Sequence, residues 1–234
     1  NRSLENPKKK QTTLLMDIET AACFSIAFIA TPILIVLVRL LFILPSLRLP
    51  TSVKKKKKLI QECQLSILLG SGGHTGEMMR IISKLDMGKV SRTWIYTSGD
   101  NASLAKAQDY ERKSGTSLQY IPIPRARTVG QSYILSIPTT IYSFLFSAIA
   151  MLKHRPAVIL LNGPGTCVPV AYILFLYKLL GLCNTKIIYI ESLARVNKLS
   201  LSGLLLLPIS DRFIVQWESL YQQYSRVEYY GILI

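Results

Sequence analysis

The chain has 234 residues, half of them hydrophobic, and its 28 lysines and arginines against 13 acidic residues give a formal net charge of +15. This length suits one ordinary domain with additional segments, and the charge indicates anionic partners such as phosphates or an acidic membrane surface. Aromatic residues do not interleave with the basic run, so no nucleic-acid partner is expected. Four dispersed cysteines and two histidines argue against a zinc cluster, and neither a metal nor a cofactor is expected.

A polar segment over residues 1–20 precedes an apolar run over residues 21–45, whose only charge is Arg39. The 18 uncharged residues before Arg39 approach the length of a membrane-spanning helix. A cleavable signal peptide would have a shorter apolar core. We therefore expect residues 21–45 to form an uncleaved transmembrane anchor, with a buried soluble helix as the alternative.

Residues 46–58 are expected to form a basic linker, because Lys54–Lys58 is an unbroken lysine run. Together with Arg39 and Arg48, this run outweighs Lys8–Lys10 on the other side of the anchor. The positive-inside rule then predicts a single-pass protein whose carboxyl-terminal side faces the cytosol. The lysine run is also expected to contact anionic headgroups.

Strand-like and helix-like segments alternate over residues 59–234, which form the predicted globular domain. The predicted strands are Leu65–Leu69, Thr93–Thr97, Leu118–Pro122, Ala157–Leu161, Lys186–Ile190 and Arg212–Gln216. Repeated β–α alternation predicts an α/β fold, a doubly wound Rossmann-like parallel sheet with helices on both faces. We expect the sheet to end near Gln216. Ligands of such sheets bind beyond the carboxyl ends of the strands, at the switch point of the strand order.

One predicted helix is unusually apolar, because residues 133–152 include no charge. By length it is a candidate second span. Pro138, the serines and threonines, and its position between two strands favour instead a helix that covers the sheet or lies in the membrane interface.

A glycine-rich turn follows the first predicted strand. It consists of Gly70, Ser71, Gly72, Gly73, His74, Thr75 and Gly76. The glycines permit positive φ angles and a close approach of ligand to backbone. A helix beginning at Thr75 or Gly76 would direct free N–H groups at an anion, most often a phosphate. The turn lacks both the Gly-Lys-Ser/Thr of a P-loop and the third glycine of a dinucleotide motif. A tight turn without a ligand is the alternative.

Five motifs stand together at the predicted strand ends and at the carboxyl terminus. They are Gly70–Glu77, Leu161–Cys167, Tyr189–Arg195, Phe213–Trp217 and Gly231–Ile234. In this combination they resemble, from Leu65 to the end of the chain, the fungal form of one family. It is the membrane-anchoring subunit of the endoplasmic-reticulum UDP-N-acetylglucosamine transferase, the fourteenth asparagine-linked glycosylation protein family.

The resemblance implies a reaction, a location and a partner. The reaction adds the second N-acetylglucosamine to dolichyl-diphosphate-N-acetylglucosamine during lipid-linked oligosaccharide synthesis for protein N-glycosylation. It occurs on the cytosolic face of the endoplasmic reticulum membrane, with the nuclear envelope as a second location. Two chains together resemble a GT-B glycosyltransferase. This chain is then the acceptor-side half, inactive alone, and a soluble catalytic subunit carries the nucleotide-sugar domain.

Within that framework two groups of residues are expected to form the site. The acceptor diphosphate is assigned to Gly70, Ser71, Gly72, Gly73, Thr75, Gly76, Gly163, Gly165 and Thr166. The transfer also requires a base for the acceptor hydroxyl, and His74 is the candidate because imidazole exchanges protons near neutral pH. The alternative is that His74 caps the turn or hydrogen-bonds the diphosphate. Glu191 is the second catalytic candidate, since strand-end carboxylates are rarely needed for packing; Glu77 ranks below both.

The carboxyl-terminal tail, Tyr229–Ile234, is apolar although chain ends are ordinarily polar and frayed. The residues expected to dock into the soluble partner are Tyr230, Gly231, Ile232, Leu233 and Ile234. The alternative is that the tail packs back onto its own domain.

Two other functions remain open from the sequence. A membrane-anchored dinucleotide-dependent oxidoreductase would use the same glycine turn, with Asp100 on the ribose, but no Tyr-x-x-x-Lys pair occurs. A pure membrane adaptor without a substrate site would explain the anchor and the tail, yet it leaves the two glycine turns unexplained.

Overall fold

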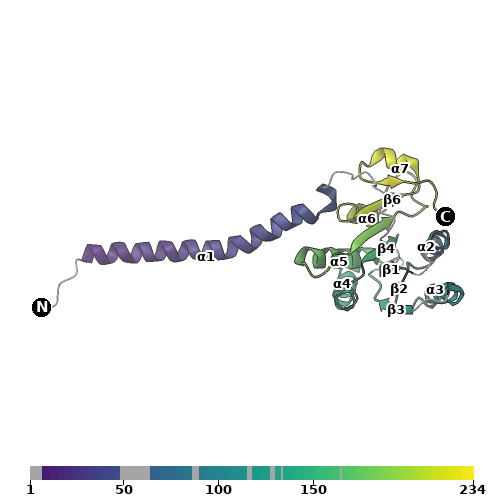
Figure 1. Cartoon of the computed structure of the whole chain (residues 1–234), viewed down its shortest axis with the longest axis horizontal. Coiled ribbons are helices and arrows are strands. Elements are labelled where there is room, and N and C mark those ends of the chain that lie inside the picture. Colours follow the sequence, from purple (N-terminus) through teal and green to yellow (C-terminus); the bar gives the residue numbers. More distant parts are fainter. Residues whose placement is uncertain are drawn as a thin grey trace. The chain divides into compact units, whose positions relative to one another are not determined.

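A computed structural model describes residues 7–47, 64–85, 90–114, 118–126, 130–132, 134–163 and 165–234. The chain divides into two compact units, Asn1–Ile43 and Leu44–Ile234, of which the first contains helix α1 (Pro7–Ile43) and the second the α/β domain (Figure 1). Most of the predicted basic linker, including the lysine run, lies outside the described residues.

The domain is built on a seven-stranded sheet in which all pairings are parallel. The strands are β1 (Leu65–Leu68), β2 (Arg92–Thr97), β3 (Leu118–Ile123), β4 (Val158–Asn162), β5 (Lys186–Ile190), β6 (Arg212–Val215) and β7 (Glu228–Tyr229). Their order is β3-β2-β1-β4-β5-β6-β7. The chain winds outward from β1 to β3 and then returns to β4 beside β1, so the switch point lies between β1 and β4. The predicted doubly wound parallel sheet is therefore confirmed.

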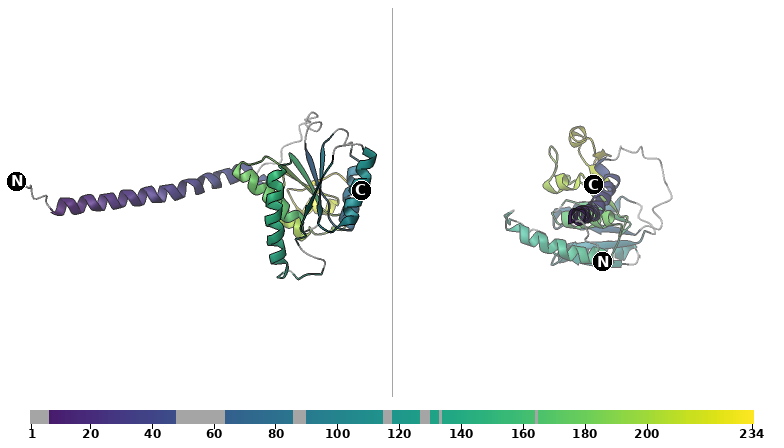
Figure 2. Two further views of the ribbon diagram at one scale, coloured as in Figure 1. Left: turned by 90° about the horizontal axis from the view of Figure 1, so that it is seen from below. Right: turned by 90° about the vertical axis from the view of Figure 1, so that its left-hand side faces the viewer.

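Helices cover both faces of this sheet, as right-handed crossovers require when the winding direction reverses. The helices are α2 (Gly73–Ser83), α3 (Asn101–Ser114), α4 (Ser136–Lys153), α5 (Cys167–Leu180), α6 (Leu201–Leu206) and α7 (Glu218–Gln223), and a short 3-10 helix, η1, covers Pro45–Leu47. Figure 2 shows α2 and α3 on one face and α4 and α5 on the other. Helix α2 begins two to three residues before the predicted start at Thr75 or Gly76, because Gly72 and Gly73 already turn the chain into the helix.

The core contains a fully buried polar connection between β2 and α3. Arg92 donates two hydrogen bonds to the Glu111 carboxylate, at 2.7 and 2.8 Å, and the Trp94 indole N–H donates a third at 2.7 Å. Because each charge is fully paired, burial is tolerated, whereas removal of one partner would leave an uncompensated charge. This contact fixes α3 against β2 and hence the start of α3 near the glycine-rich turn.

The sequence predicted that the sheet ends near Gln216. This is wrong, because β7 adds an edge strand to β6. Ile214 pairs with Glu228 and Val215 with Tyr229. A two-residue strand carries almost no alternating pattern, so sequence periodicity alone does not reveal it.

Helix α4 buries small polar side chains and exposes large apolar ones. Its buried residues are Ser136, Ser143, Ser147 and Met151. Its large apolar side chains face outward, among them Ile137, Ile141, Leu145 and Ile149, each 55–62% exposed. One side packs on α5, where the Tyr177 hydroxyl donates to the Ala148 carbonyl at 2.7 Å. The helix is long and apolar enough to cross a membrane by length and composition, but here it covers the sheet and presents an apolar stripe.

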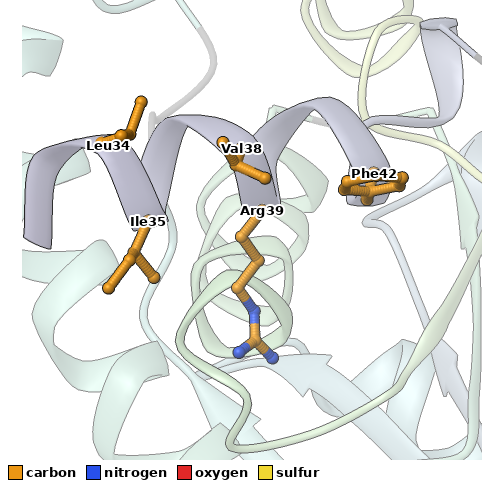
Figure 3. Close-up of a pocket in the computed structure, with 5 residues that line it drawn as sticks. All are labelled: Leu34, Ile35, Val38, Arg39 and Phe42. Carbon is orange, nitrogen blue, oxygen red and sulfur yellow. The ribbon is translucent and has the colours of Figure 1, made fainter. Parts of the chain in front are cut away.

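Helix α1 contains the other candidate span, Thr20–Ile43, with 24 residues, a mean hydropathy of 2.7 and no buried residue. The Ser25 and Thr31 hydroxyls donate to carbonyls four residues earlier, at 2.8 and 2.7 Å, so they need no water. Figure 3 shows Ile35 and Arg39 pointing to the same side of the last turns of α1, with Arg39 charged among apolar neighbours. A long basic side chain near a helix end can extend to the membrane interface.

Candidate functional site

Both glycine turns of the sequence lie at the switch point. The first joins β1 to the start of α2 at Gly73, and the second joins β4 to the start of α5 at Cys167. Because β1 and β4 are adjacent and parallel, their carboxyl ends bring the two turns to the same edge of the sheet. The first N–H groups of each helix have no partner within the helix and carry its positive dipole end. Such an arrangement is suited to binding an anion between the two turns.

The first turn is open to a ligand, and hydrogen bonds from buried side chains stabilise it. Gly72 has a φ of +62°, and a Cβ at Gly72, Gly73 or Gly76 would meet no atom within 4 Å. The Thr75 hydroxyl instead bonds inward, to the Gly70 carbonyl and, at 2.6 Å, to the Ser103 hydroxyl. Thr75 therefore shapes the turn with its side chain and has only its backbone N–H to offer a ligand.

Asp100 belongs to the same hydrogen-bond network, through Ser103. Its carboxylate accepts from the Ser103 N–H at 3.0 Å and from the Ser103 hydroxyl at 2.7 Å. This is an N-cap at the start of α3. The carboxylate that an oxidoreductase would need for a ribose is thus engaged in capping, and the structure gives that alternative no support.

His74 lies against the second turn. A Cβ built at Gly163 would fall 2.1 Å from Nδ1 of His74, and Gly163 has a φ of +79°. The glycine therefore provides the space that the imidazole occupies. The His74 side chain is 34% exposed, while its Nδ1 is buried without a hydrogen-bond partner among the described residues. The exposed part of the side chain therefore lies elsewhere than at Nδ1.

Glu77 stands behind His74, one turn along α2, and is only 7% exposed. Its Oε2 lies 3.8 Å from Nδ1 of His74. Its Oε1 accepts from the Leu193 N–H and, at 2.9 Å, from Nε2 of Gln216. Burial raises the pKa of Glu77, but the neighbouring His74 imidazole and hydrogen bonds from Leu193, Ser192 and Gln216 outweigh this effect and hold the pKa below the ordinary value. Glu77 is therefore an anion held by two hydrogen-bond donors, with its second oxygen facing the imidazole.

Glu191 is enclosed by hydrogen-bond donors of its own chain. It is fully buried, and its carboxylate accepts from the Ser192 N–H, the Ser200 N–H and the Ser200 hydroxyl at 3.0, 3.0 and 3.1 Å. Ser200 in turn caps α6 by accepting from the Gly203 N–H at 2.9 Å. These bonds close the loop between β5 and α6. The physical role that the geometry supports for Glu191 is to hold this loop, rather than to accept a proton.

The second turn contributes buried and exposed groups. Gly165 is exposed, whereas Thr166 is buried at the N-cap of α5. Cys167 is fully buried, and this burial raises the pKa of its thiol, so it is an unreactive packing residue. At the end of β4, Asn162 donates to the Ile190 carbonyl at 3.3 Å while its Oδ1 has no partner among the described residues.

Two site residues were missed from the sequence, Gln216 and Asn162. Both are buried amides at strand ends, Asn162 closing β4 and Gln216 following β6. A polar residue directly after an apolar strand was the available signal, because carboxyl ends of parallel strands share one edge.

The tail divides between two environments. Leu233 and Ile234 pack against the buried cluster that includes Ile67 and Met78, and the Leu233 N–H donates to Oε1 of Gln216 at 3.3 Å. Tyr230 and Ile232 are 55% and 52% exposed. The last two residues thus support packing of the tail on its own domain, while the Ile232 side chain is exposed and the Tyr230 hydroxyl accepts from Arg212 at 2.6 Å and donates to Glu228 at 2.7 Å.

Comparisons with known proteins agree on one family. The family described as "Oligosaccharide biosynthesis protein Alg14 like" matches residues 65–233. The chain is 99% identical to UDP-N-acetylglucosamine transferase subunit ALG14 of Candida albicans, over 94% of this chain and 100% of the relative. It is 48% identical to the subunit of the same name from Debaryomyces hansenii, over 94% and 100%. It is 38% identical to that of Rattus norvegicus, over 74% and 84%.

Two solved structures are also similar. MurG of Acinetobacter baumannii gives a TM-score of 0.48 at 13% identity, over 67% of this chain and 42% of that chain. UDP-N-acetylglucosamine 2-epimerase from Rickettsia bellii gives 0.48 at 13% identity, over 73% and 45%. This chain spans less than half the length of either structure.

Proposed function

This chain belongs to the Alg14-like family of oligosaccharide biosynthesis proteins, and we propose that it is the membrane-anchored, acceptor-binding subunit of a UDP-N-acetylglucosamine transferase. The transferase adds the second N-acetylglucosamine to dolichyl-diphosphate-N-acetylglucosamine on the cytosolic face of the endoplasmic reticulum. The observation that carries the proposal is the meeting of two glycine turns and two helix N-termini at the switch point. The names of the relatives support UDP-N-acetylglucosamine as the donor.

The acceptor diphosphate is bound at the opening between the two turns. The backbone groups that approach it come from Gly70, Ser71, Gly72, Gly73, Thr75, Gly76, Gly163, Gly165 and Thr166. Backbone N–H groups and helix dipoles suit a diphosphate because they stabilise negative charge without adding counter-charges that must be desolvated. The net charge of +15 also favours an anionic lipid over a neutral one.

His74 is the base of the transfer. The acceptor hydroxyl oxygen forms a bond to the anomeric carbon of UDP-N-acetylglucosamine, and the bond from that carbon to the phosphate oxygen breaks, so UDP leaves with the electron pair. The hydroxyl proton passes to the imidazole and then to solvent. A positioned base typically accelerates such a step by roughly 10²–10⁴-fold.

The donor side is assigned to a soluble partner. A GT-B transferase closes its cleft with two doubly wound domains, and the described residues of this chain form one. The nucleotide-sugar domain is therefore supplied by a soluble catalytic subunit, recruited in part through the exposed Tyr230 and Ile232. No cofactor takes part in the reaction as written.

Two apolar surfaces keep the site near its lipid substrate. Helix α1 contributes the anchor over Thr20–Ile43. The outward stripe of α4 rests in the membrane interface, because large exposed aliphatic side chains are stabilised there and not in water. An acceptor whose lipid stays in the bilayer then reaches the glycine turns without leaving the membrane.

The test is a transferase assay of the full chain in membranes, with and without the soluble subunit, using UDP-N-acetylglucosamine and the lipid acceptor. We expect transfer only when both chains are present, and loss of transfer from the His74→Ala complex. Turnover by this chain alone would contradict the division of labour. A complex that forms normally yet retains full activity with His74→Ala would remove the base.

A further inference from the structure

Glu77 is a buried carboxylate beside His74, the proposed base, and the transfer step as written does not use it. Glu77 is anchored through Oε1 by two donors, the Leu193 N–H after β5 and the Gln216 amide after β6. Its other oxygen, Oε2, is the atom that faces Nδ1 of His74, at 3.8 Å. A buried anion held by two other segments of the chain has little freedom to turn away from the imidazole.

Nδ1 of His74 needs such a partner. It is buried, it has no hydrogen-bond partner among the described residues, and Gly163 lies against the ring at Nδ1 and Cε1. A buried nitrogen without a partner is unfavourable, because it has lost its hydrogen bonds to water. The separation of 3.8 Å is longer than a hydrogen bond, but catalytic hydrogen bonds in ligand-free sites are often long and tighten in the complex.

We propose that Glu77 is a positioning residue for His74: its Oε2 accepts the Nδ1–H of the imidazole and leaves Nε2 as the basic nitrogen that faces the ligand. Gln216 and the Leu193 amide orient Glu77 in turn. This assignment rests on the proposed role of His74 as base, but the tautomer it specifies is a property of this chain alone.

The same geometry predicts what an amide at position 77 would do. Oε1 must remain an acceptor, because the Leu193 N–H and the Gln216 amide both donate to it. In Glu77→Gln the side-chain NH₂ is therefore directed at Nδ1 and donates to it. The imidazole proton then moves to Nε2, the nitrogen that must be free to accept a proton. The substitution removes one charge and reverses the tautomer while changing the side-chain shape very little.

Imidazole ¹⁵N chemical shifts of the full chain in detergent micelles give a direct readout, because the chain has only two histidines. His154→Ala assigns the signals, and mildly alkaline pH keeps imidazoles neutral. We expect the Nδ1–H tautomer for His74 in the wild type and in the control Glu218→Gln, which removes an exposed carboxylate elsewhere. Glu77→Gln should show the Nε2–H tautomer. A wild-type His74 protonated on Nε2 would overturn the proposal without any variant.

Kinetics of the complex with the soluble subunit connect the tautomer to transfer. Glu77→Gln should lower kcat by roughly 10²–10⁴-fold with little change in the KM for the acceptor, and Glu77→Asp should recover part of kcat. An unchanged kcat despite a reversed tautomer would refute the positioning role and would leave the anchoring and acceptor-binding function intact. If no wild-type complex transfers the sugar, the proposed function fails, whatever the tautomer.

Discussion

The imidazole of His74 occupies the space that a side chain at Gly163 would need, since a Cβ there would lie 2.1 Å from Nδ1. Gly163→Ala should therefore displace His74 and reduce transfer about as much as His74→Ala, while the acceptor still binds. Gly99→Ala is the matched control, because Gly99 also has a positive φ, +83°, but no atom within 4 Å of a built Cβ. Steady-state rates of both complexes test this, and equal losses in the two variants would mean that backbone strain alone is responsible.

Substitutions in the first glycine turn should affect binding more than folding. Gly73 has no positive φ and no close neighbour, so Gly73→Val is accommodated by the fold but places methyl groups where the diphosphate approaches. We expect a raised KM for the lipid acceptor and an unfolding temperature within a few degrees of wild type. Gly72→Val should do the same with an added backbone penalty of about 1–2 kcal/mol. Unchanged acceptor kinetics for Gly73→Val would place the diphosphate elsewhere.

Glu191 should prove to be a stability residue. Glu191→Ala leaves the buried N–H groups of Ser192 and Ser200 without an acceptor, at a cost of about 1–3 kcal/mol each. Thermal unfolding of the full chain in detergent should show a clear destabilisation, and Glu218→Ala should not. A normal unfolding temperature combined with lost transfer would restore the catalytic assignment made from the sequence.

The acid limb of the stability profile should depend on Glu77. Burial raises its pKa, but polar contacts lower it by a larger amount, so the pKa lies below the ordinary 4.5. Such a group stabilises the fold fully above pH 4.5, and the contribution is lost as the pH falls through the lower folded-state pKa. Glu228, paired with Arg212, behaves in the same way. The unfolding temperature should therefore decline below about pH 4.5, less steeply in Glu77→Gln. An unfolding temperature that rises on acidification would contradict this.

The tail should separate into two functions by single substitutions. Leu233→Asp places a charge against the core cluster and should destabilise the domain itself. Ile232→Asp changes an exposed residue and should leave the fold intact but weaken recovery of the soluble subunit with membranes. Coprecipitation and thermal unfolding of both variants provide the measurements. Normal partner recovery with Ile232→Asp would restrict the tail to intramolecular packing.

Much of the fold was accessible from the sequence because six strands are long enough to show β-branched and aromatic runs. The glycine turns also fell at the expected strand ends, since a parallel sheet collects those ends at one edge. By contrast, Glu228–Tyr229 is too short to show a pattern, and its pairing depends on the position of β6. The start of α2 was misplaced because Gly73 has poor intrinsic helix propensity yet occupies the first turn.

The detailed site was less accessible, because periodicity assigns elements and not the side chains that meet between them. No local sequence signal shows that Gly163 lies against His74, because the two residues are 89 positions apart in the chain. The hydrogen bonds of Glu191 were hidden for the same reason, since their donors come from the loop that it closes. Gln216 contacts Glu77 only because the fold brings the residue after β6 next to helix α2.

The serines that α4 turns inward make its outer stripe a constraint on how the protein can be handled. A fragment without α1 would still expose Ile137, Ile141, Leu145 and Ile149, so cutting away the anchor does not yield a protein suited to plain buffer. Micelles, nanodiscs or polar replacements on that stripe are needed to keep such a fragment monodisperse at the concentrations that crystallisation or spectroscopy require.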